Sequence, residues 1–137
     1  MPSDRKSFWP ALIIIVIAFG VPLTISLIEL RVARNAHAET SAIRYLESVA
    51  NAESEYRKPH QGYTASLADL PTLPKPEPYY RYEYRKTATD GYVVTAEPVD
   101  PGKHGRRYFY MDQSGVITYE VLKPATPKSP EAPPLAK

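Results

Sequence analysis

"RVARNAHAETSAIRYLESVANAESEYRK" (residues 31–58) is the stretch of sequence that decides the fold. It contains no Pro or Gly and is rich in Ala and Glu, which favour helix. Its apolar residues recur mostly at steps of three and four, which places them on one face of a helix. The members of this apolar stripe are Ala42, Ile43, Leu46, Val49, Ala50 and Tyr56. A helix with one apolar face needs a surface to pack against, so the rest of the chain must supply one.

The charged residues of this segment are expected to cover the other faces of the helix and to meet solvent. They are Glu39, Arg44, Glu47, Glu53 and Arg57. Pro59 is expected to end the helix, because its ring clashes with the carbonyl of the preceding turn, and Gly62 follows closely. The predicted amphipathic helix therefore covers residues 31–58.

An apolar run precedes this helix and contains "ALIIIVIAFGVPLTISLIEL" (residues 11–30). No charged residue occurs from Ser7 to Ile28, a length of about 22 residues or about 33 Å of helix, against about 30 Å of bilayer hydrocarbon. The run predicts a transmembrane helix over residues 7–30, kinked at Pro22 and continuous with the helix that follows. Its predicted anchor residues are Phe8, Trp9, Leu12, Ile13, Ile14, Ile15, Val16, Ile17, Phe19, Leu23, Ile25, Leu27 and Ile28.

The amino terminus allows more than one form of the mature protein. Residues 1–6 are either a short cytoplasmic segment or a leader. "AHA" at residues 36–38 has the small-x-small form of a signal-peptidase site, which would make Glu39 the first residue. Arg31 and Arg34 lie between the apolar run and that site, where charge is usually absent. A retained anchor is therefore favoured over a discarded signal peptide.

The surface for the helix stripe is predicted within residues 59–122. "YYRYEYRKT" alternates, with Tyr80, Tyr82 and Tyr84 on one face and charged residues on the other, which is typical of a strand with one buried face. The predicted strands cover residues 79–87, 92–98, 106–111 and 116–122. An Asp-Gly pair, a Pro-Gly loop and a Ser-Gly turn separate them. The expected fold is α+β, with the long N-terminal helix packed on a three- or four-stranded antiparallel sheet.

The last stretch of the chain, "KPATPKSPEAPPLAK" (residues 123–137), is rich in proline and has almost no apolar bulk. Such a composition leaves little to bury in a core. It predicts a disordered or extended tail.

The order of these features resembles the type IV pilins and the pseudopilins of type II secretion. In that family the long helix is followed by an aromatic residue, Gly-Tyr and a Ser-Leu-x-x-Leu turn. The matching residues here are Tyr56, Gly62, Tyr63, Ser66, Leu67 and Leu70. The resemblance implies a structural, membrane-anchored pilin-like subunit or accessory protein of a type IV pilus or type II secretion system. It also implies a single-pass protein of the bacterial inner membrane, with a periplasmic or extracellular sheet domain and a helix that contacts lipid and other pilin-like subunits.

The family's leader sequence is matched only in part. Pilin precursors have Gly before the Phe that becomes the first residue, and Glu at the fifth mature position. Here Ser7 precedes Phe8, and Leu12 takes the fifth position. Cleavage between Ser7 and Phe8, cleavage before Glu39 and an unprocessed amino terminus therefore all stay open.

Composition argues against an enzyme. The chain has no cysteine, which excludes a disulfide framework, a thiolate metal site and a cysteine nucleophile. His37, His60 and His104 lack the spacing of metal ligands and are expected at the surface. We predict no catalytic residue, no metal and no cofactor. The formal net charge is only +2 and the basic residues are scattered, which gives no support to a nucleic-acid partner.

Two other interpretations of the function stay open. One is a single-pass envelope protein with a pilin-like periplasmic domain that does not assemble. The other is a small tethered ligand-binding module, in which tyrosines form an aromatic platform for a saccharide or for nucleic-acid bases. Tyrosines that fill the core are the favoured interpretation, whereas an exposed cluster of them would favour the ligand-binding module. Lys103, Arg106 and Arg107 form a small basic cluster, expected to be a solvated edge or an assembly contact.

Overall fold

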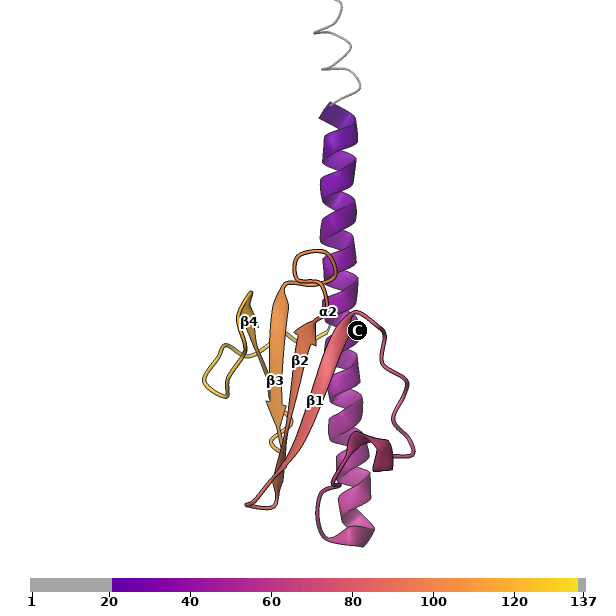
Figure 1. The fold of residues 1–137 in the computed structure, drawn as a ribbon, viewed down its shortest axis with the longest axis vertical. Coiled ribbons are helices and arrows are strands. Elements are labelled where there is room, and N and C mark those ends of the chain that lie inside the picture. The colour runs from indigo at the N-terminus through magenta and orange to yellow at the C-terminus, as the bar shows by residue number, and fades with distance from the viewer. Residues whose placement is uncertain (1–20, 136–137) are drawn as a thin grey trace, which may run out of the picture. The chain divides into compact units, whose positions relative to one another are not determined.

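The computed structural model describes residues 21–135 of the 137-residue chain. Its elements are helix α2 (Val21–His60), the 3-10 helix η2 (Leu67–Asp69) and strands β1 (Tyr80–Thr87), β2 (Gly91–Pro98), β3 (Arg107–Asp112) and β4 (Ile117–Val121). The strands form one antiparallel sheet in the order β1-β2-β3-β4, as Figure 1 shows. The predicted α+β fold, a long helix and an antiparallel sheet, is confirmed. The chain divides into two compact units, residues 1–33 and residues 34–137.

The second unit is built around a core between α2 and one face of the sheet. The side chains of Leu46 and Val49 on the helix, and of Val94 and Met111 on the sheet, are completely buried there, and Phe109 is 1% exposed. Val94 lies opposite Met111 across β2 and β3, so same-face residues of neighbouring strands meet the helix together. Removal of this apolar surface from water is the main force that holds helix and sheet together.

The predicted packing residues of the helix do not all lie in this core. Ile43, Leu46 and Val49 are buried in it, and Ala50 is half-buried against it. Tyr56 lies outside the core, where its ring stacks on His60 with the centroids 4.0 Å apart. Residues four apart are neighbours on a helix surface. Tyr56 therefore packs on His60 of its own helix and not, as predicted, on the sheet.

The helix ends later than Pro59, where the sequence places its end. Pro59 lies inside the last turn, and α2 ends at His60. Gln61 then adopts a left-handed conformation with φ of 55°, and its N–H donates to the Arg57 carbonyl at 2.9 Å. This is a helix C-cap motif, which satisfies one of the free carbonyls of the last turn. The cap, and not the proline two residues before it, stops the helix.

The first hairpin turns at the predicted place but is longer than an Asp-Gly pair. Thr87 pairs with Gly91, so residues 88–90 form a three-residue loop and Gly91 is already the first residue of β2. Asp90 takes the left-handed conformation that such loops use, with φ of 52°. A Cβ atom on Gly91 would lie 2.7 Å from Gln113 Oε1 and 2.9 Å from Thr87 Oγ1, so a larger residue here would have to displace the Gln113 side chain.

Of the two states predicted for the proline-rich tail, disordered or extended, the disordered one is wrong for residues 123–135, because this part of the tail is bonded to β4. Tyr119 N–H donates to the Pro130 carbonyl at 2.9 Å, and Ala132 N–H donates to the Ile117 carbonyl at 2.8 Å. These bonds place the tail along the outer edge of β4, and Ala132 and Leu135 pack against the core. The tail can pair because Pro130 contributes only a carbonyl, while the N–H comes from a residue that is not proline.

Deletion of the residues after Leu122 is expected to lower the free energy of unfolding of the second unit by about 1–3 kcal/mol. It removes two backbone and two side-chain hydrogen bonds to β4 and two packed side chains. Urea unfolding of the full chain and the truncated chain, followed by circular dichroism, measures this loss. Lys128→Ala, an exposed tail residue, serves as the control. An unchanged transition in the truncated chain would show that the tail contributes nothing.

The first unit contributes residues 21–33 of α2 to the described part of the chain. Its large apolar side chains are more than half exposed: Ile25, Leu27, Ile28, Leu30 and Val32. Within residues 21–135, no helix combines the length and the apolar character that a membrane crossing requires. Most of the predicted anchor lies outside the described residues, namely Phe8, Trp9, Leu12, Ile13, Ile14, Ile15, Val16, Ile17 and Phe19, as does the Ser7–Phe8 cleavage site. The side chain of Leu23 also lies outside what the structure describes.

Candidate functional site

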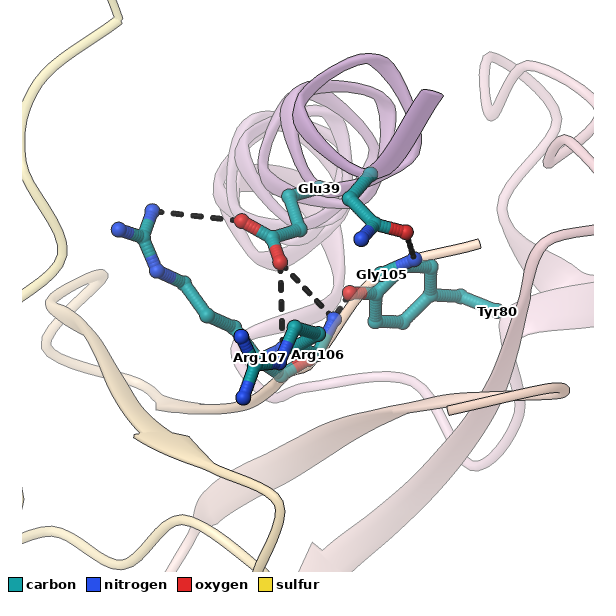
Figure 2. A network of polar contacts seen from close by, with 6 residues as sticks. Glu39, Tyr80, Gly105, Arg106 and Arg107 are labelled. Carbon is teal, nitrogen blue, oxygen red and sulfur yellow. Dashed lines mark hydrogen bonds and ion pairs between the residues drawn. The ribbon is translucent and has the colours of Figure 1, made fainter. Parts of the chain in front are cut away.

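The β2–β3 loop is held to α2 by two helix side chains, Asn35 and Glu39, and Figure 2 shows this contact from close by. Asn35 Oδ1 accepts a hydrogen bond from the N–H of Gly105 at 2.9 Å. Glu39 Oε1 accepts from the N–H of Arg106 at 2.9 Å and from the N–H of Arg107 at 3.3 Å. We call these five residues the latch. It satisfies three successive backbone donors that the sheet leaves unpaired where β3 begins.

The side chains of Arg107 and Tyr80 complete the latch. The guanidinium of Arg107 lies 3.4 Å from Glu39 Oε2 and also stacks over the ring of Tyr119, 4.8 Å from its centroid. Tyr80 donates its hydroxyl hydrogen to the Arg107 carbonyl at 2.8 Å. Gly105 has φ of 105°, and a Cβ atom there would collide with the Tyr80 ring, so a larger residue could not bring the loop this close.

The latch changes the prediction for two groups of charged residues. Glu39 was expected to meet solvent, yet its side chain is only 13% exposed because the loop covers it. The basic cluster is also divided: Arg107 faces Glu39, Lys103 pairs with Asp100 at 3.4 Å, and Arg106 is exposed. A continuous basic surface is therefore absent at this loop.

Replacement of Glu39 by Ala is expected to destabilise the second unit by about 2 kcal/mol, because two backbone N–H groups lose a charged acceptor. Hydrogen exchange at the Arg106 and Arg107 amides, measured together with urea unfolding, reports the loss locally and globally. Glu47→Ala is the matched control, since Glu47 is an exposed carboxylate of the same helix. Equal effects of the two substitutions would contradict a role for the latch.

A second carboxylate, Glu53, is completely buried. Its Oε1 lies 2.6 Å from the hydroxyl of Tyr84, and its Oε2 accepts from the N–H of Thr64 at 3.2 Å. The Tyr84 hydroxyl also lies 3.0 Å from the Thr64 carbonyl. This network ties the helix, the segment after the helix and β1 to one another. The prediction that Glu53 meets solvent is wrong. Leu46, Val49 and Glu53 follow steps of three and four, and this spacing is the sequence signal that places Glu53 on the buried face.

The tyrosines face the core more than they face solvent. Tyr63, Tyr80 and Tyr92 are less than 10% exposed, and Tyr82 packs its ring on the buried Tyr45 of the helix, 4.3 Å between centroids. Tyr45 is thus a packing residue of the helix in addition to the predicted ones. Burial raises the pKa of Tyr80, Tyr82 and Tyr92 above the usual value, because the charged phenolate is poorly solvated in the core.

Stability is expected to fall as the pH rises above about 10. The unfolded tyrosines ionise near that pH, while the folded chain holds Tyr80, Tyr82, Tyr84 and Tyr92 in the neutral form. Their contribution is therefore complete below pH 10 and is lost above it, by up to about 1.4 kcal/mol per pH unit for each group. Urea unfolding between pH 8 and pH 11 tests this, and Tyr92→Phe should give a shallower decline. A decline as steep as that of the unchanged chain would rule out Tyr92 as a contributor.

The structure brings two of the three histidines to the same residue. His104 stacks on Tyr79 with ring centroids 5.1 Å apart, and His37 meets the Tyr79 ring edge-on at 6.1 Å. His37 Nε2 also lies 3.4 Å from Glu77 Oε2. Across residues 21–135, no three His, Cys, Asp or Glu side chains are grouped so that they could hold a metal ion. The cluster is an aromatic contact between the helix, the segment before β1 and the β2–β3 loop.

Comparison with solved structures shows a likeness to a pilin. A type IV pilin from Shewanella oneidensis is similar in structure, with a TM-score of 0.48 and 24% sequence identity over 61% of this chain and 89% of that chain. No protein-family model matches the sequence. No curated protein matches it either.

Proposed function

We propose that this chain is a membrane-anchored, pilin-like subunit or accessory protein of a type IV pilus or type II secretion system. The observation that carries the proposal is the run of exposed apolar side chains on α2, Ile25, Leu27, Ile28, Leu30 and Val32. Exposed apolar residues gathered in this way are typical of a surface that meets lipid or another protein. In the sequence they overlap the uncharged run from Ser7 to Ile28, which has the length of a membrane anchor.

The second unit supports a structural role more than a catalytic one. Two of its carboxylates, Glu39 and Glu53, have side chains that are at most 13% exposed, and both are engaged by backbone N–H groups of the same chain. A general acid or base must reach its substrate, and neither group is free to do so. We therefore assign the buried carboxylates to folding and the exposed helix to attachment and contact with other subunits, in the bacterial inner membrane with the sheet domain outside the cytoplasm.

A second candidate function rests on the same exposed residues. A single-pass envelope protein that never assembles would use them for lipid contact alone. The two functions differ in whether the helices of different copies meet.

Cysteine cross-linking separates the two functions, because the chain has no cysteine of its own. Ile28→Cys places a thiol among the exposed apolar residues of α2, and Val99→Cys places one at a similarly exposed apolar position of the second unit. If subunits assemble through the helix, oxidation of intact cells should yield disulfide-linked dimers of the Ile28→Cys protein and few of the Val99→Cys protein. Mass spectrometry of the same membrane fraction gives the mature amino terminus, where a start at Phe8 indicates leader cleavage.

Two outcomes would count against the proposal. Monomers in the membrane fraction for both cysteine variants would favour the envelope protein that does not assemble. A soluble product that begins at Glu39 would overturn the anchor itself, since the apolar run would then be a signal peptide.

A further inference from the structure

A hollow of about 500 Å³ lies between α2 and the turn that joins β3 to β4. Ala50 and Ser54 on the helix and Ser114 and Gly115 in the turn have small side chains, which leaves this space unfilled. The volume is in the range of small-molecule sites in proteins. No part of the latch lines it.

Tyr92 gives the hollow a polar group that needs a partner. This residue is only 2% exposed and lines the hollow, yet its hydroxyl makes no hydrogen bond to any residue that the structure describes. The hydroxyls of Tyr63, Tyr80 and Tyr84, by contrast, are all bonded within the protein. Among the described residues, every fully enclosed polar side-chain atom has a partner, so the Tyr92 hydroxyl must reach open space, and the hollow is that space. A hydroxyl that opens into a hollow without a protein partner takes its partner from solvent or from a ligand there.

Further polar groups stand around the same hollow. Asn51 and Ser54 project from α2 on one side and Gln113 from the β3–β4 turn on the other. None of the three side chains makes a hydrogen bond to a residue within 21–135. Two carboxamides and a hydroxyl can each donate and accept, so together they suit a ligand that carries many hydroxyl groups.

The cations at the hollow are already neutralised. Arg57 lies 3.5 Å from Asp90, donates to the Tyr63 hydroxyl at 2.9 Å and stacks over the Tyr63 ring. Lys58 lies 2.6 Å from Glu55. Each positive charge has a nearby carboxylate, so the hollow has no excess charge that would select an anion. Arg57 instead adds a flat guanidinium beside the tyrosine ring.

We propose that this hollow binds an uncharged saccharide. The C–H face of a sugar ring can pack on the flat, half-exposed guanidinium of Arg57, and the sugar hydroxyls suit the Tyr92 hydroxyl and the carboxamides of Asn51 and Gln113. The site goes beyond a structural role and does not depend on assembly, because every residue in it belongs to the second unit of one chain.

Nuclear magnetic resonance titration of the ¹⁵N-labelled full chain tests the site with two probes, cellotetraose and the tetramer of N-acetylglucosamine. Any detergent must lack a sugar headgroup, which would compete. Millimolar probe should give saturable shifts of the Gln113 and Gly115 amides and of the Asn51 side-chain amide. A response to one probe alone would tell whether plain hydroxyls or acetamido groups are recognised, and either response supports the site.

Tyr92→Phe removes one hydroxyl and keeps the ring, and it should weaken binding about five- to tenfold. Tyr45→Phe is the matched control, because Tyr45 is a buried tyrosine that lines a different hollow, and it should leave affinity unchanged. The proposal is overturned if neither probe gives saturable shifts, or if both variants weaken binding equally. Self-association that Tyr92→Phe abolishes, without sugar binding, would assign the hollow to a second copy of the chain and also overturn it. Because these readouts use the isolated chain, they are independent of the cross-linking result on assembly.

Discussion

The whole second unit depends on the burial of one helix face. Leu46 and Val49 have no exposed surface, and they share one core with Val94 of β2 and Met111 of β3, the two central strands. Helix and sheet therefore each complete the other's core, and neither could keep its apolar face from water alone. The strands form a meander, and in β1 and β2 alternate residues are turned toward the core. This alternation places Tyr80, Tyr82 and Tyr84 on the inner face of β1 and the charged residues between them on the outer face.

Polar contacts at two positions along the helix fix how the sheet unit sits on it. Glu39 holds the start of β3, and Glu53 holds Tyr84 and the segment after the helix. Fourteen residues separate them, or about 21 Å along the helix axis. Apolar burial is non-directional and would tolerate a small slide of helix against sheet, whereas these hydrogen bonds would be broken by it. The two carboxylates thus fix the position of the helix along the sheet, while apolar contact supplies most of the stability.

The tail protects one edge of the sheet. An uncovered edge strand presents unpaired backbone groups to other chains, and β4 would be such an edge. The bonds from Tyr119 to Pro130 and from Ala132 to Ile117 occupy that edge. The protein is proposed to associate with other copies through its helix. A covered β4 edge would prevent those copies from pairing through their strands instead. Proline suits this role because it can accept a ladder bond but cannot extend the sheet further.

The sequence by itself determined the elements. The spacing of Ile43, Leu46 and Val49 predicted the helix and its buried face, and alternation in residues 79–87 predicted the first strand and its inner tyrosines. Both are local patterns, set by the period of the backbone, and can be seen without a partner in view. Tertiary structure alone decided what the polar residues do. Glu39, Glu53 and the proline-rich tail are polar in sequence and look like solvent-exposed segments. Each nevertheless forms hydrogen bonds with backbone groups that lie 11 to 68 positions away in the sequence. Whether such a group faces water depends on the partner that folding places against it, and a one-dimensional pattern does not contain that partner.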